Sequence, residues 1–101
     1  MHYNKLVRDR IPEIIRGKGE MPITHIADEQ EYEIKLKEKL QEEVAEFLKD
    51  SNPEELADIL EVVYALGDNL GVAKEELEKI RAEKAEKRGG FKEKIILDGT
   101  N

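Results

Sequence analysis

The sequence predicts a mainly α-helical fold, an antiparallel bundle of three main helices and a short N-terminal helix with a small two-stranded β-ribbon, completed by oligomerisation. Helix-forming residues are abundant, and the chain has only three prolines. Apolar residues recur every three or four positions over two long segments. The second of these segments is apolar around most of its circumference. A chain of 101 residues is long enough for one domain, residues 1–101.

The first long helix is expected to begin at Asp28. Asp28 followed by Glu31 is a capping-box pattern, which is typical of a helix N-terminus. The apolar positions then continue at spacings of three and four to about Lys49. They are Tyr32, Leu36, Leu40, Val44 and Phe47.

Asn52-Pro53 restarts the chain, with Asn52 as N-cap and Pro53 as the first helical residue. We expect this second helix to run to about Asp68, with Asn69 or Gly71 supplying a left-handed turn at its end.

A third helix is expected over roughly Ala73 to Arg88, ended by Gly89-Gly90. Near the N-terminus, Asp9 is expected to cap a short helix with Pro12 in its first turn. The β-prone segments Ile23–Ile26 and Phe91–Leu97 predict two short strands, which would pair as the ribbon.

Composition excludes several classes of function. The chain lacks cysteine, so disulfides and thiolate metal sites are ruled out. The sequence shows no arrangement of serine or cysteine with histidine as nucleophile and base, which disfavours covalent catalysis. A net charge of −7 disfavours nucleic acid and anionic membrane as partners. The sequence shows neither a signal peptide nor an apolar run of membrane-spanning length, from which we expect a cytoplasmic protein without a membrane partner.

Two acidic pairs flank the break between the first two helices. Glu43 and Glu46 precede it, and Glu55 and Asp58 follow it. Residues three apart lie on one face of a helix, so two helices folded back at Pro53 would point four carboxylates at one another. Such a cluster repels itself unless a cation lies between its members, and oxygen-only ligands suit Mg²⁺ or Mn²⁺.

Helical geometry places these acids near the packing faces. Glu43 falls only about 20° outside the apolar stripe of the first helix, and Glu46 about 80° outside it. On the second helix, Glu55 and Asp58 lie away from the exposed acidic stripe. That stripe consists of Glu54, Glu61 and Asp68. A helix that is apolar nearly all round must be buried nearly all round, which a small chain achieves only with a second copy.

An ordinary structural role competes with the metal site. Glu55 lies three residues after Asn52 and can complete a capping box. Glu43 and Glu46 can pair with Lys39 or Lys49 on the surface.

Two groups of cations are candidates for binding phosphate. Arg81, Lys84 and Arg88 fall on the apolar side of the third helix, where their stems can cover the core or their heads can converge on phosphates. Lys5, Arg8 and Arg10 form a basic run that can reach a ligand or pair with acids of the protein.

These motifs resemble the all-α nucleoside triphosphate pyrophosphohydrolase superfamily, which includes the MazG-like and phosphoribosyl-ATP pyrophosphohydrolase-like proteins. Glu43-Val-Ala-Glu46 followed by Glu55-Leu-Ala-Asp58 is similar to the magnesium signature of that superfamily. Residues 4–9 and 87–91 are similar to a small single-domain branch of it. The resemblance covers roughly residues 3 to 97.

The resemblance implies a homodimer or homotetramer that cleaves a nucleotide between its α- and β-phosphates in a Mg²⁺-dependent reaction. The substrate would be a nucleoside triphosphate or a phosphoribosyl-ATP-like molecule, and the products a monophosphate and pyrophosphate. Glu43, Glu46, Glu55 and Asp58 would hold the metal, and Lys84 and Arg88 would contact phosphate. A house-cleaning role for noncanonical triphosphates follows as a hypothesis. The alternatives are a non-catalytic helical interaction module and nucleic-acid binding through the basic run at residues 5–10.

Overall fold

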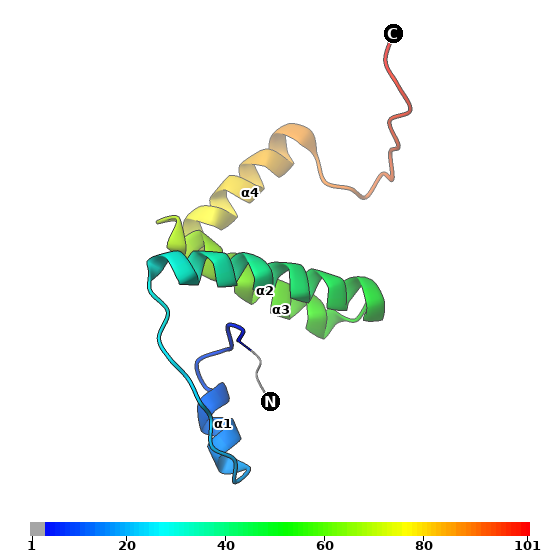
Figure 1. The fold of residues 1–101 in the computed structure, drawn as a ribbon. Coiled ribbons are helices and arrows are strands. Elements are labelled where there is room, and N and C mark those ends of the chain that lie inside the picture. The colour runs from blue at the N-terminus through cyan, green and yellow to red at the C-terminus, as the bar shows by residue number, and fades with distance from the viewer. Residues whose placement is uncertain (1–3) are drawn as a thin grey trace.

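Four helices make up the computed structural model, which describes residues 4–101 (Figure 1). They are α1 (Ile11–Gly17), α2 (Glu29–Asp50), α3 (Pro53–Asn69) and α4 (Lys74–Arg88). Helices α2 and α3 pack side by side in opposite directions and form the centre of the molecule. Helices α1 and α4 lie on opposite sides of this pair in Figure 1, and the C-terminal segment extends away from α4. The expected set of three main helices and one short helix is therefore confirmed.

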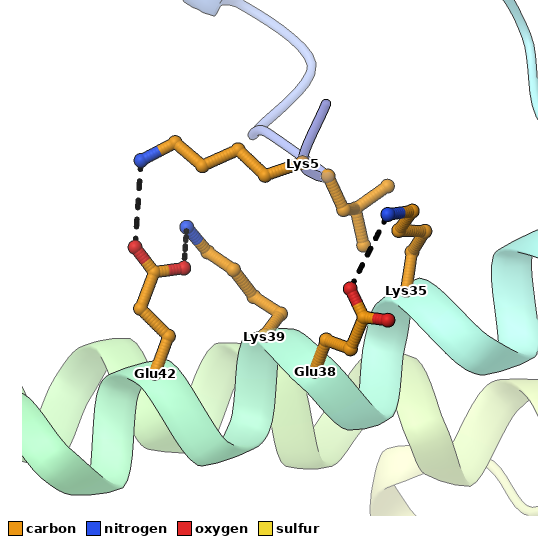
Figure 2. A pocket seen from close by; sticks show the side chains of 6 residues that line it. Lys5, Lys35, Glu38, Lys39 and Glu42 are labelled. Carbon is orange, nitrogen blue, oxygen red and sulfur yellow. Dashed lines mark hydrogen bonds and ion pairs between the residues drawn. The ribbon is translucent and has the colours of Figure 1, made fainter. Parts of the chain in front are cut away.

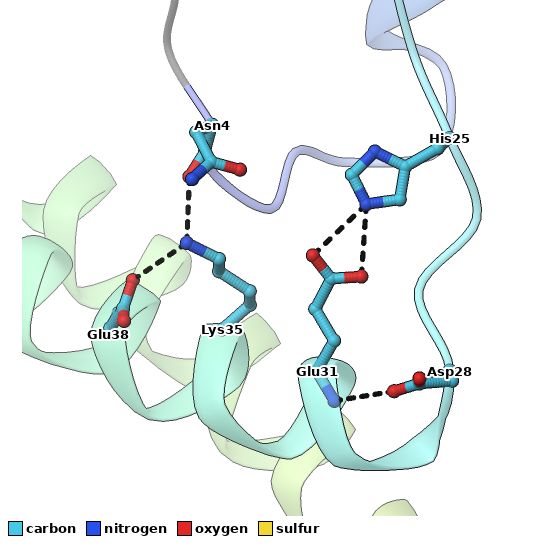
Figure 3. Close-up of polar contacts among 6 residues, drawn as sticks. All are labelled: Asn4, His25, Asp28, Glu31, Lys35 and Glu38. Atoms are coloured by element: carbon cyan, nitrogen blue, oxygen red, sulfur yellow. Dashed lines mark hydrogen bonds and ion pairs between the residues drawn. The ribbon is translucent and has the colours of Figure 1, made fainter.

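The N-terminus of α2 is capped as its sequence predicts. Asp28 Oδ1 accepts a hydrogen bond from the backbone N–H of Glu31 at 2.8 Å. The Glu31 carboxylate faces the His25 ring, whose Nε2 lies 3.0 Å from both of its oxygens (Figure 3). The cap thus also fixes the chain segment that leads into α2.

A tight turn reverses the chain between α2 and α3. Ser51 adopts a left-handed conformation with φ of 52°, and its N–H donates to the Phe47 carbonyl at 2.7 Å. Asn52 Oδ1 then accepts from the N–H of Glu55 at 3.0 Å, and Pro53 opens α3. This local chemistry confirms the expected restart and brings the end of α2 beside the start of α3.

Helix α4 is attached to the far end of α3 by its first turns alone. Gly67 is buried, and a Cβ at this position would lie 3.0 Å from the Val72 carbonyl oxygen and 3.7 Å from Leu77 Cδ2. Lys74 Nζ lies 4.8 Å from the centre of the Tyr64 ring. Beyond these contacts, α4 diverges from the helix pair until Gly89, at φ of 82°, ends it.

The apolar core of the described chain is very small. Leu36 of α2 and Val62 of α3 are its buried apolar side chains, with 1% and 8% of their surfaces exposed. The radius of gyration is 17.8 Å, whereas a compact chain of this length has about 13 Å. None of the described helices combines the length and the apolar character needed to cross a bilayer.

Two sequence predictions about the flanking segments are wrong. Residues 4–101 contain no strand, and the two segments expected to form the ribbon leave Ile23, Ile26 and Phe91 at least 95% exposed. An isolated two-stranded ribbon is marginal in water, and neither segment has an apolar surface beneath it. Asp9 does not cap α1, because the N-cap position is Arg10, which makes no side-chain cap hydrogen bond.

Candidate metal and nucleotide site

Carboxylates from both helices converge where α2 ends and α3 begins. One oxygen each from Glu43, Glu55 and Asp58 lie within 4.8 Å of one another. A second trio with the same spacing consists of Glu46, Asp50 and Glu55. Glu55 belongs to both trios and therefore occupies the middle of a cluster of five acids, which we call the carboxylate cluster.

The sequence analysis identified four of these five acids. Glu43 is only 12% exposed, as expected from its position beside the apolar stripe, whereas Glu46 is exposed. The sequence reasoning missed Asp50. Its signal was present, because Glu43, Glu46 and Asp50 follow one another at spacings of three and four and so share a helix face. Glu46 lies with Asp50 rather than in the trio of Glu43 and Asp58.

Two cations neutralise part of the carboxylate cluster. Arg8 Nη2 lies 2.8 Å from Asp58 Oδ1, and Lys39 Nζ lies 3.4 Å from Glu43 Oε1. None of the ion pairs among residues 4–101 involves Glu46, Asp50 or Glu55. The negative charge is therefore compensated on one side of the cluster and uncompensated on the other.

This imbalance shows in the proton affinity of Glu55. Partial burial, followed by the charges of Glu46, Asp58, Asp50 and Glu43, raises the pKa of Glu55 above its ordinary value. Each of these effects disfavours the charged form of the side chain. A cation placed among the same oxygens would act in the opposite direction.

A groove of about 500 Å³ runs along the same side of the helix pair, beneath the N-terminal segment that precedes α1. Its lining contains two members of the carboxylate cluster, Glu43 and Asp58, together with Glu61 and Asp9. The cations Lys5, Arg8 and Lys39 line it as well. The rest of its surface is apolar or aromatic and comes from Leu6, Val7, Ile11, Tyr32, Leu36, Val62 and Ala65. Its volume is in the range of sites for small molecules.

A smaller pocket of about 200 Å³ adjoins this groove and shares Lys5, Leu6 and Lys39 with it (Figure 2). Lys5 and Lys39 approach the two oxygens of Glu42 at 3.4 and 3.2 Å. Although partial burial opposes the effect, hydrogen bonds and charges from Lys39 and Lys5 lower the pKa of Glu42. Lys35 also lines this pocket and donates to the Asn4 carbonyl at 2.9 Å (Figure 3).

The predicted phosphate-binding cations are divided between two places. Lys5 and Arg8 lie in the groove, while Arg10 pairs with Glu13 on α1 at 3.4 Å. Arg81 is held by Glu78, with contacts of 2.7 to 3.1 Å. Lys84 and Arg88 are exposed in the outer half of α4, which runs away from the helix pair, and α4 joins α3 at the end opposite to the carboxylate cluster.

Both ordinary structural roles expected from the sequence, the helix cap at Glu55 and the surface ion pairs of Glu43 and Glu46, occur in part. Asn52 caps the N–H of Glu55, and Lys39 pairs with Glu43. The backbone cap leaves the Glu55 carboxylate available to the cluster, and no such pair accounts for Glu46 or Asp50 among the described residues. The arrangement is therefore a set of oxygen donors of the kind that hard divalent cations prefer, beside a groove lined by both cations and acids.

Comparisons with known proteins leave the family unassigned. No family model matches the chain, and no solved structure matches it. A stretch of 42 residues is 52% identical to an uncharacterised protein of Mycolicibacterium smegmatis, covering 42% of this chain and 43% of that protein. The chain thus matches less than half the length of this relative.

Proposed function

We propose that the protein is a metal-dependent nucleotide pyrophosphohydrolase that cleaves a nucleoside triphosphate, or a phosphoribosyl-ATP-like substrate, between the α- and β-phosphates. The observation that carries this proposal is the position of Glu55, which is shared by two carboxylate trios and has no cationic partner among residues 4–101. The chain's resemblance to the all-α pyrophosphohydrolases, stated above from its motifs, supplies the reaction class.

The donor set suits Mg²⁺ or Mn²⁺. Oxygens bound to one divalent ion at about 2.0–2.6 Å lie roughly 3–5 Å apart, and both trios have oxygens at such spacings. The site would consist of Glu43, Glu55 and Asp58, with Glu46 and Asp50 beside them. An ion bound there would neutralise phosphate oxygens. It would also orient or acidify a water for in-line attack on phosphorus.

The groove supports the choice of a nucleotide as substrate. Its apolar lining with Tyr32 offers a surface for a base or sugar, and Lys5, Arg8 and Lys39 offer positive charge for phosphates. In this proposal Arg8 and Lys39 balance Asp58 and Glu43 while the site is empty of substrate. When substrate binds, Arg8 and Lys39 hold its phosphate oxygens close to the carboxylate cluster. Arg81, Lys84 and Arg88 would take part only if supplied by another chain.

Replacement of Glu55 by glutamine tests the proposal, and Glu54 provides a matched control in the same helical turn. Glu54 is exposed, lies outside both trios and loses the same charge in Glu54→Gln. We expect Mg²⁺-dependent pyrophosphate release from a panel of nucleotides to fall at least about 100-fold in Glu55→Gln, because an ionised ligand is lost. Glu54→Gln should retain activity. No metal-dependent turnover by the wild type, or equal turnover by both variants, would contradict the proposal.

A non-catalytic helical interaction module is the second candidate, favoured by apolar side chains that remain exposed on α2 and α3. The two candidates differ in their response to metal. An interaction module should melt at the same temperature with and without Mg²⁺. A rise in melting temperature with Mg²⁺ that Glu46→Gln abolishes would argue against it.

A further inference from the structure

The small pocket beside the groove gathers three lysine ammonium groups (Figure 2). Lys5 enters it from the N-terminal segment that precedes α1, and Lys35 and Lys39 enter it from successive turns of α2. The acids in its lining are Glu38 and Glu42. Three ammonium groups and two carboxylates give this site, which we call the lysine pocket, a formal charge of +1, whereas the chain has a net charge of −7.

The two lysines on α2 are covered to an unusual extent. The side chains of Lys35 and Lys39 are each 18% exposed, whereas that of Lys37 on the same helix is 68% exposed. Lysine is among the residues least often buried, because its ammonium group is strongly hydrated. Like charges four residues apart on one helix face also destabilise the helix. Natural proteins break such local rules mainly at functional sites, which points to a ligand of opposite charge.

The acids of the lysine pocket hold its lysines only loosely. Lys5 and Lys39 lie 3.4 and 3.2 Å from the two oxygens of Glu42. The Lys35 ammonium lies 3.3 Å from Glu38. Charge-assisted N–H···O bonds are usually about 2.7–2.9 Å long. Both acids are also more exposed than the lysines of α2, at 56% for Glu38 and 38% for Glu42, so they can turn toward solvent and leave the three ammonium groups to an anion.

The size of the lysine pocket restricts the ligand. Its volume is about 200 Å³, and sites that enclose drug-sized molecules have about 300–1,000 Å³. The pocket therefore suits one small group and not a whole nucleotide. Lysine is a common phosphate ligand, and a terminal phosphate with a second phosphate linked to it carries more than two negative charges at pH 7. Three ammonium groups in a small pocket match such a diphosphate.

We propose that the lysine pocket binds a diphosphate group, which joins the N-terminal segment to α2. Lys5 holds the group from the segment, and Lys35 and Lys39 hold it from the helix. Free pyrophosphate and the two terminal phosphates of a nucleotide share this chemistry. Lys39 also lies 3.4 Å from Glu43 of the carboxylate cluster, so a phosphate chain can extend from that cluster into the lysine pocket. Only the nucleotide as the source rests on the proposed function.

Calorimetric titration with inorganic pyrophosphate, in buffer stripped of divalent ions, tests the site with full-length protein and without any hydrolysis. We expect Lys35→Gln to weaken binding at least about tenfold, because it removes a charged donor. Lys37→Gln is the matched control, since Lys37 also pairs with an acid of its own helix but lies outside the pocket. Lys35→Arg keeps the charge and should retain most of the affinity. No binding by the wild type, or equal weakening in Lys35→Gln and Lys37→Gln, would overturn the proposal.

Hydrogen exchange locates the bound pyrophosphate in the same metal-free buffer. The backbone amides of residues 5–8 should exchange more slowly once the anion joins their segment to α2, and Lys35→Gln should abolish this protection. Protection confined to residues 84–88, where Lys84 and Arg88 are exposed, would overturn the assignment.

Nucleotides distinguish the two sources of the diphosphate. If the terminal phosphates of a nucleotide occupy the pocket, Lys35→Gln weakens binding of a nucleoside triphosphate about tenfold and leaves binding of the monophosphate unchanged. Loss of pyrophosphate binding alone supports a site for the free anion and separates it from the proposed substrate. Equal weakening for the monophosphate would mean that Lys35 acts on the fold and would contradict the proposed site.

Discussion

At the scale of single residues, Glu55 connects the local structure of the chain with its proposed chemistry. The Asn52 cap fixes its backbone N–H, and the turn between α2 and α3 brings four other carboxylates around its side chain. Arg8 and Lys39 compensate other members of the cluster. The charged form of Glu55 is consequently disfavoured in the folded protein without metal.

The stability of the metal-free protein should depend on pH through Glu55. Because the folded pKa is raised, the folded chain binds a proton more tightly than the unfolded chain. This effect lowers stability above the raised pKa, and the loss disappears as pH falls toward the ordinary value of 4.5. We therefore expect Glu55→Gln to melt higher than wild type at pH 7 in a chelating buffer, with the gain vanishing near pH 4.5.

Glu54→Gln controls for the loss of an acid in the first turn of α3, where both residues lie. Thermal melts of the three proteins across this pH range measure the effect. A gain of equal size in Glu54→Gln, or one that grows as pH falls, would show that repulsion within the cluster is not its cause.

At the scale of elements, the sequence predicted the helix ends that are set by residues close in the chain. The caps at Asp28 and Asn52 and the glycines at 71 and 89 define helix ends without reference to distant residues. The β-ribbon was a prediction about two segments far apart in the chain, and β-propensity alone did not determine whether they meet. Asp50 was missed because the first helix was followed only to about Lys49, although its acidic face continues to Asp50.

The cap of α3 should be worth a measurable part of the stability. Asn52→Ala removes the acceptor for the Glu55 N–H and is expected to cost about 1 kcal/mol in the free energy of unfolding. Asn52→Asp keeps the acceptor and should restore most of the loss. Urea titrations of the two variants and wild type measure these differences. A cost in Asn52→Asp as large as that in Asn52→Ala would mean that the cap does not carry the effect.

At the scale of the whole molecule, the sequence predicted that one chain cannot bury all of its apolar surface. The second long segment was apolar nearly all round, and the structure leaves Leu56 and Leu60 of α3 about half exposed. The direction of α4 could not be predicted, since it depends on how Leu77 meets Gly67. As a result, the sequence predicted Lys84 and Arg88 as phosphate ligands without showing that their helix runs away from the carboxylate cluster.

With so small a core, one buried side chain should carry a large share of the stability. Leu36 is 1% exposed, and Leu36→Ala is expected to cost about 2–5 kcal/mol through lost burial and the cavity left behind. Domains of this size are stable by only about 5–15 kcal/mol, so this change should lower the melting temperature by roughly 10 °C or more. Ile23→Ala removes atoms from a side chain that is 95% exposed and should change stability by less than about 0.5 kcal/mol. Similar losses in the two variants, measured by thermal melts at one protein concentration, would show that the α2–α3 contact is not the centre of the fold. A loss confined to Leu36→Ala would place that centre at Leu36, at the base of the groove.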